Sequence, residues 1–448
     1  MGNTLIREAT IINEGIIRSG DVLISRDTIR KIAGPGTIKN IPGQIDVVDA
    51  KGLWLIPGVI DDQVHFRDPG FPEKGDFFTE SRAAVAGGVT SVMDMPNTMP
   101  QTTTRMLLDK KIENISRKSL VNFGFYFGAT NDNIEEIRKL DTSLVCGIKV
   151  FMGSSTGNML VDDPKSLKRI FAEATIPVAV HAEDDGIIHK NLEHYKKKFG
   201  DNIPFDLHPE IRSVEACYSA STYAVELARK HGTRLHILHL STAREMELLA
   251  PEPFSEKKKI TGEVCVHHLW FCSDDYKKYG SRIKWNPAIK TSEDRDGLLK
   301  ALLEDRIDVV ATDHAPHTFE EKSKPYLLAP SGGPLIQHSL NVMLELAFQG
   351  KIAPEKVVEK MCHTPARLFG IRDRGFIREG YKADLVLVNP DSSWEVSTEN
   401  ILYKCGWSPF ERTTFSSRIT HTFVNGRLVY DNGLIDETHR GEPLNYIR

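Results

Sequence analysis

The chain has 448 residues, of which 40% are hydrophobic, 26% charged and 8% aromatic. This composition excludes disordered and fibrous proteins, because it supplies enough apolar side chains for a large core. The 57 basic and 61 acidic residues give a net charge of −4, and there is no long basic tract. We therefore expect a small-molecule substrate and neither nucleic acid nor a membrane surface as partner.

The sequence also bears on the compartment. No apolar run is long enough to span a bilayer, and the first residues lack the layout of a signal peptide, so we predict a cytoplasmic protein. The six cysteines are scattered and form no CxxC pair, which indicates free, buried thiols in a reducing compartment. Whether copies of the chain associate into a homo-oligomer stays open.

The N-terminal segment has the pattern of a small β-sheet. Short strand-like stretches occur at 5–12, 21–24 and 28–32. Turn sequences rich in glycine and proline follow them at 34–36 and 42–43.

The middle of the chain alternates short apolar runs with amphipathic stretches of helical length, such as 76–87 and 213–231. This alternation is typical of βα units that feed a parallel sheet. Eight runs predict a closed (β/α)8 TIM-like barrel of the α/β class, because a doubly wound open sheet more often stops at about five or six strands. The runs are 55–65, 90–97, 122–129, 146–153, 176–183, 234–241, 260–269 and 308–317.

The C-terminal segment returns to the β pattern. Residues 383–388 form one expected strand, and 421–430 form a hairpin around Asn425-Gly426, a strong two-residue turn signal. We therefore predict a small β-sandwich domain from both chain ends, residues 1–53 plus 375–448, and a (β/α)8 barrel domain at 54–374.

Polar side chains close most of the barrel strands. In such barrels the reactive groups lie at the carboxyl ends of the strands, so these side chains are expected to converge. Three histidines and one aspartate there supply nitrogen and oxygen ligands for Zn²⁺ or a similar ion. They are His65, His181, His239 and Asp313. His236, His267 and His268, also at strand ends, are expected in packing or in hydrogen bonds to the ligands.

Lys149 is the unusual member of this set, because an ammonium would repel a metal ion. Reaction of its amine with carbon dioxide would give a carbamate, an anion able to bridge two ions. The alternative is an amine that reaches solvent or pairs with a rim carboxylate.

Five motifs resemble the cyclic amidohydrolases, and among them the dihydroorotases. They are PGVIDDQVHFRDPG at 57–70, the strand that carries Lys149, HAE at 181–183, HILHLS at 236–241 and TDHAPH at 312–317. The resemblance spans nearly the whole chain and includes the split β-domain. It implies one or two zinc ions, with His65 and Asp313 on one ion, His181 and His239 on the other, and N-carboxylated Lys149 between them.

One position departs from the family pattern. Gln63 stands where dihydroorotases have the first histidine of a His-x-His pair, and its amide oxygen binds zinc more weakly than imidazole does. Gln63 is therefore a doubtful ligand, and the number of ions is left at one or two.

Substrate choice depends on residues outside the metal ligands. The resemblance assigns the substrate carboxylate to Arg67, Asn97 and His317, and the pyrimidine ring to Asn286. The alternative for Arg67 is a surface ion pair with Asp68 or Glu73. After the eighth strand, the glycine-containing segment 331–334 is either a mobile cover for the site or an ordinary turn.

The implied reaction is reversible hydrolysis of dihydroorotate to N-carbamoyl-L-aspartate, a step of pyrimidine biosynthesis, by a metal-bound hydroxide with Asp313 as proton shuttle. Two alternatives stay open. One is a hydantoinase or dihydropyrimidinase-like enzyme that acts on uncharged rings. The other is an inactive, dihydroorotase-like structural partner of aspartate transcarbamoylase, which Gln63 suggests.

Overall fold

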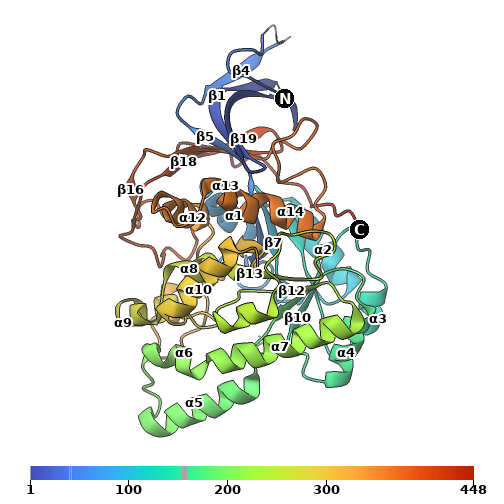
Figure 1. Cartoon of the computed structure of the whole chain (residues 1–448), viewed down its shortest axis with the longest axis vertical. Coiled ribbons are helices and arrows are strands. Elements are labelled where there is room, and N and C mark those ends of the chain that lie inside the picture. Colours follow the sequence, from blue (N-terminus) through green and yellow to red (C-terminus); the bar gives the residue numbers. More distant parts are fainter. Residues whose placement is uncertain (1, 40, 42, 154–158) are drawn as a thin grey trace.

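The structure is a computed structural model, and it describes residues 2–39, 41, 43–153 and 159–448. A barrel with surrounding helices forms the larger part, and a curled sheet lies at one end of the molecule, at the top of Figure 1. Within the described ranges, no helix combines the length and the apolar character needed to cross a bilayer.

Eight strand positions form the barrel, and every neighbouring pair is parallel. The ring closes where His65 N–H donates to the carbonyl of His314 at 2.7 Å and Val64 bridges His314. The predicted barrel is therefore confirmed. Its strands are β6 (Val59–Val64), β7 (Val89–Asp94), β8 (Asn122–Phe125), β9 (Phe127–Gly128), β10 (Ile148–Phe151), β11 (Val178–His181), β12 (Leu235–Ile237), β13 (Ile260–Cys265) and β14 (Val309–Ala311).

Two of the expected strands are divided. The run 122–129 becomes β8, which pairs with β7, and β9, which pairs with β10. The run 55–65 breaks at Gly58, where an added Cβ would lie 2.0 Å from Thr90 Oγ1. Only the part after Gly58 belongs to the barrel, because β5 (Trp54–Pro57) pairs with strands of the other sheet.

Helices cover the outside of the barrel, and side chains cap several of them. Asp76 accepts from the N–H of Thr79 to begin α1, and Ser213 caps α7, which ends at the left-handed Gly232. The helices are α1 (Phe77–Ala86), α2 (Arg105–Ser116), α3 (Ile134–Arg138), α4 (Pro164–Glu173), α5 (Asp185–Phe199), α6 (His208–Ile211), α7 (Val214–His231), α8 (Val266–Trp270), α9 (Tyr276–Tyr279), α10 (Ser292–Leu303), α11 (Phe319–Lys322), α12 (Ser339–Phe348), α13 (Pro354–Val358) and α14 (Thr364–Phe369).

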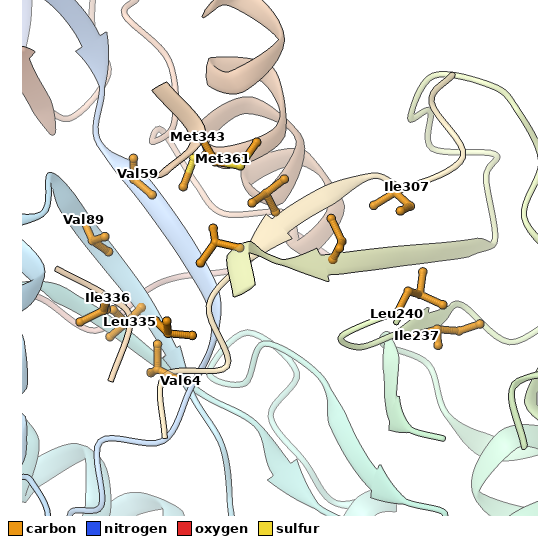
Figure 2. Packing of buried hydrophobic residues seen from close by; sticks show 14 of the residues in the cluster. Val59, Val64, Val89, Ile237, Leu240, Ile307, Leu335, Ile336, Met343 and Met361 are labelled. Carbon is orange, nitrogen blue, oxygen red and sulfur yellow. The ribbon is translucent and has the colours of Figure 1, made fainter. Parts of the chain in front are cut away.

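The main core lies between the barrel strands and these helices. Figure 2 shows Val59 of β6 and Val89 of β7 in one cluster with Met343 of α12 and with Leu335 and Ile336, which precede that helix. All five side chains are fully buried. The packing fixes the strands, so the residues at their ends hold constant positions.

Strands from both chain ends form one nine-stranded sheet. β5 joins the two ends, because it pairs in parallel with β1 and antiparallel with β15. The strands of this sheet besides β5 are β1 (Asn3–Asn13), β2 (Ile16–Ser25), β3 (Thr28–Ala33), β4 (Ile45–Asp49), β15 (Leu385–Asn389), β18 (Arg418–Val424), β19 (Arg427–Asp431) and β20 (Leu434–Ile435), while β16 (Trp394–Glu395) and β17 (Thr414–Phe415) form a separate pair.

The expected hairpin is present as β18 and β19, with Asn425 at φ 50° and Gly426 at φ 74°. Side chains from both chain ends share one core, which includes Ile11, Leu55 and Leu385. The sheet curls around that core.

The last described residues close the amino end of the barrel. Phe123 of β8 donates to the Glu442 carbonyl at 3.0 Å and accepts from Leu444 N–H at 2.8 Å. Tyr446 is buried there with Tyr126 and Cys146, in a cluster to which α14 contributes Phe369. A Cβ at Gly124 would lie 1.9 Å from the Tyr446 hydroxyl, so the tail packs directly on β8.

Candidate active site

Polar side chains at the carboxyl ends of the barrel strands surround one cavity of about 410 Å³. All ten residues that the sequence singled out line it. They are Gln63, His65, Arg67, Asn97, Lys149, His181, His239, Asn286, Asp313 and His317. Ser331 and Gly332, from the predicted segment 331–334, also line it. Sequence reasoning missed the other lining residues, which are Phe71, Lys74, Phe151, Ala315 and Pro330.

His65 and Asp313 meet on one side of this cavity. His65 Nε2 lies 3.2 Å from Asp313 Oδ1, and His65 Nδ1 lies 2.8 Å from Asn97 Oδ1. Gln63 Nε2 also donates to Asp313 Oδ1, at 3.2 Å. The Gln63 oxygen faces Cys265 Sγ at 3.9 Å, so Gln63 contacts Asp313 as a donor.

His181 and His239 meet at a second point, with His181 Nδ1 3.0 Å from His239 Nε2. His181 Nε2 donates to Glu183 at 2.9 Å, and the Arg212 guanidinium pairs with the same carboxylate. The charge of Arg212 and the hydrogen bond from His181 hold the pKa of Glu183 far below its usual range despite its burial. Glu183 therefore stays ionised and keeps the proton of His181 on Nε2, which leaves Nδ1 facing His239.

Lys149 lies between these two pairs in the lining, on β10, and its side chain is only 1% exposed. Its Nζ lies 4.5 Å from the centroid of the Phe151 ring, and in the described part of the chain no carboxylate forms an ion pair with it. Burial lowers the pKa of Lys149 to about 7, although Asp313 and Glu263 oppose the shift. The alternative of a solvent-exposed or ion-paired amine does not describe this lysine.

The donor set fits divalent cations. At one point the imidazole nitrogens of His181 and His239 lie close together. At the other, an imidazole nitrogen of His65 lies close to a carboxylate oxygen of Asp313. Zinc ligands are grouped in this way. Among the described residues, buried His239 Nδ1 has no hydrogen-bond partner, and burial beside His181 lowers the pKa of His239 well below its usual value. Three non-glycine residues here adopt positive φ, at 66° for Arg67, 38° for His239 and 49° for Asp313. Backbone strain of this kind concentrates at functional sites.

Two further groups of metal-ligand residues lie near the site. Cys265, His267 and His268 form one, and Asp62, His236 and Glu263 form the other. His236 lies 3.2 Å from Asp62 and 3.4 Å from Glu263, and these carboxylates raise its pKa to about 9 against the effect of burial. His267 stacks on Trp285 with ring centroids 4.5 Å apart. Neither group lines the cavity as a set.

A cationic side of the cavity lies beside Asp313. Arg67 Nε donates to the Pro316 carbonyl and Nη2 donates to His317 Nε2, both at 3.0 Å. Since a guanidinium only donates, His317 is neutral and carries its proton on Nδ1, which faces Glu321 at 3.3 Å. Burial and the adjacent Arg67 lower the pKa of His317 to about 3, in agreement with this state. In the described part of the chain Arg67 forms no ion pair with Asp68 or Glu73, and Asp68 pairs with Lys118 instead, so the surface alternative does not describe Arg67.

Asn286 and the segment 331–334 complete the cavity. Asn286 Oδ1 is buried and has no hydrogen-bond partner among the described residues, so it is available to a donor on a ligand. Gly332 N–H donates to the Lys284 carbonyl at 2.9 Å, and Gly333 accepts from Ala315 N–H at 3.0 Å. These bonds make the segment a fixed part of the cavity wall.

Comparison with known proteins places this site in a family. The model of the Amidohydrolase family matches residues 54–429. The dihydroorotase of Methanothermobacter thermautotrophicus is 33% identical over 88% of this chain and 89% of its own length. The allantoinase of Solibacter usitatus is 32% identical over 99% of this chain and 97% of its own.

Among solved structures, the L-hydantoinase (dihydropyrimidinase) of Arthrobacter aurescens superimposes with a TM-score of 0.91 at 27% identity, over 97% of this chain and 98% of that one. The resemblance to cyclic amidohydrolases, with dihydroorotases among them, is thus confirmed. A family match over most of the chain, together with the barrel and its polar cavity, shows that this protein belongs to the Amidohydrolase family.

Proposed function

We propose that the protein is a zinc-dependent dihydroorotase, which interconverts (S)-dihydroorotate and N-carbamoyl-L-aspartate in pyrimidine biosynthesis. The observation that carries the proposal is Arg67. It lies half-buried in the lining of the same cavity as His65 and Asp313, and its guanidinium is oriented by Pro316 and His317. A guanidinium held beside the reacting groups suits a substrate with a carboxylate on its ring.

The resemblance to cyclic amidohydrolases and the donor set support the same ligands. His65 and Asp313 would hold one cation and His181 and His239 the other, with Lys149 as its carbamate completing the set. A bound divalent cation polarises the ring carbonyl and lowers the pKa of water towards neutrality. Because Gln63 turns its amide nitrogen to Asp313, the first cation has one protein ligand fewer than a His-x-His pair provides.

The chain's own groups then position the substrate and move the proton. Arg67 binds the substrate carboxylate with Asn97 and His317 beside it, and Asn286 Oδ1 accepts from a ring N–H. Asp313 takes the proton from the attacking water and delivers it to the leaving ring nitrogen as the ring opens. In the reverse direction the same carboxyl returns the proton as the ring closes.

The direct test is metal content per chain together with turnover of dihydroorotate at slightly alkaline pH. We expect at least one zinc ion per chain and measurable ring opening. Metal-free protein without turnover would instead support the inactive partner of aspartate transcarbamoylase.

A second candidate is a hydantoinase or allantoinase, which the likeness to the L-hydantoinase structure and to the allantoinase sequence favours. Arg67→Met separates the two cases. The variant should lose about 100-fold in kcat/KM for dihydroorotate, since a charge-assisted bidentate contact contributes roughly 1.5–3 kcal/mol. The second candidate would be established if the enzyme does not turn over dihydroorotate and Arg67→Met leaves its turnover of neutral hydantoins unchanged.

A further inference from the structure

Two buried lysines lie behind one wall of the cavity. Lys322, the last residue of α11, is 1% exposed, and Lys284 is 7% exposed. Among the residues that the structure describes, neither forms an ion pair with a carboxylate. Burying a cation without an anionic partner is costly, so two such lysines side by side require a compensating interaction.

Backbone carbonyls provide that interaction. Lys322 Nζ donates to the carbonyls of Lys284, Pro330 and Gly332 at 3.3, 2.9 and 2.8 Å. Lys284 Nζ donates to those of Tyr326 and Ala329 at 2.7 and 2.6 Å. Three acceptors around one nitrogen match the three N–H groups of an ammonium. We call Lys284 and Lys322 the lysine clamp.

The lysine clamp holds the part of the chain that forms the wall. Four of its acceptors lie within residues 326–332, of which Pro330, Ser331 and Gly332 line the cavity. Gly332 has φ 113°, and a Cβ there would lie 2.8 Å from the Ala315 carbonyl and 3.5 Å from His317 Cδ2. The clamped wall therefore adjoins the residues that orient Arg67.

The neighbours of the clamped wall orient Arg67. Gly332 lies against Ala315 and His317, which flank Pro316. Arg67 Nε donates to the Pro316 carbonyl and Nη2 donates to His317 Nε2. A shift of the wall would therefore move the guanidinium and its contact with a ring carboxylate.

We propose that Lys322, assisted by Lys284, determines specificity for an anionic ring, because it fixes the wall at 326–332 against the residues that orient Arg67. This inference rests on the proposed function and deepens it. Lys322 is a positioning residue here, since it acts through the wall rather than by touching the reacting atoms.

The test compares Lys322→Met with Lys324→Met, which removes an exposed lysine two residues away as a matched control. Binding of orotate and of uracil, which differ by one carboxylate, is measured by calorimetry on the zinc-loaded enzyme. In Lys322→Met the Kd for orotate should rise about 30-fold, while that for uracil changes less than threefold. Lys324→Met should change both less than twofold. Equal weakening of both ligands, or none, would overturn the specificity role.

Hydrogen exchange supplies a readout that needs no substrate. Amides of residues 326–332 should exchange faster in Lys322→Met, and in Lys284→Met as a second variant should the first fold poorly, but not in Lys324→Met. Unchanged exchange in both clamp variants would refute the anchoring of the wall. If the wild type binds uracil as tightly as orotate, the proposed function itself fails, and the exchange result still decides whether the clamp holds the wall.

Discussion

The two ends of the barrel are built on opposite principles. The carboxyl end gathers buried histidines, carboxylates and lysines around an open cavity, and three of its non-glycine residues have left-handed backbone. The amino end is filled by apolar side chains from Ile60, Val309 and Phe369 and is closed by Tyr446. The difference teaches that the polar groups of the carboxyl end line a cavity available to a ligand, while the amino end is filled by packed side chains and supplies stability.

The largest effect is expected from Asp313→Asn at the carboxyl end. The amide cannot take up a proton, so kcat should fall about 10³-fold, within the range that a positioned acid-base group contributes. Steady-state turnover of the zinc-loaded protein measures the loss. The melting temperature should stay near that of the wild type, and a large drop would mean that Asp313 is needed for folding.

Tyr446→Ala tests the amino end. Removing a fully packed aromatic ring should lower the free energy of unfolding by roughly 3–5 kcal/mol, from lost burial and the cavity left behind. Urea denaturation gives the loss, and kcat of the folded fraction should be unchanged. The control Tyr446→Phe keeps the ring and should cost much less. A fall in kcat without loss of stability would contradict the assignment of stability to the amino end and of catalysis to the carboxyl end.

Gln63→His tests whether position 63, at the carboxyl end, binds a cation. The imidazole restores a nitrogen ligand and removes the hydrogen bond to Asp313, so affinity for the more weakly held cation should rise about tenfold. Titration of metal-free protein with zinc in the presence of a chelator measures this. Identical titrations of variant and wild type would show that position 63 does not bind the cation.

The last prediction concerns the change in folding stability with pH. His317 has a pKa of about 3 in the folded protein because it is buried beside Arg67, against about 6.5 when unfolded. The unfolded chain therefore binds more protons between pH 3 and 6.5, so stability falls as pH drops through that window, by at most about 1.4 kcal/mol per pH unit. Denaturation at several pH values should give a shallower decline for His317→Gln. Parallel curves would mean that His317 is already protonated in the native state.

Much of this arrangement was predictable from sequence, because two simple rules apply to it. Apolar runs separated by helical stretches predict the barrel, and the polar residue that closes each run predicts the cavity, as His181, His239 and Asp313 illustrate. Each of these side chains follows directly from its own strand. No knowledge of distant contacts was needed.

Features that depend on long-range contacts could not be predicted. The break at Gly58 was not predicted, because apolar residues stand on both sides of Pro57-Gly58 and the strands before and after it are both almost fully buried. Arg212 lies far along the chain from Glu183, and no local pattern links them. The charged and polar neighbours of Lys322 in the sequence predict a surface residue. In the structure its Nζ is instead surrounded by backbone carbonyls. The packing of Tyr446 against the amino end of the barrel could not be predicted either, since its segment has no regular periodicity.

The position of β5 between β1 and β15 has a consequence for biosynthesis. One edge of β5 stays unpaired until the residues of β15 have been made, after all the barrel strands. During that interval the growing chain presents an open, apolar strand edge, the feature that promotes association between nascent chains. Folding helpers would then be most needed late in translation, just before the second half of this sheet becomes available.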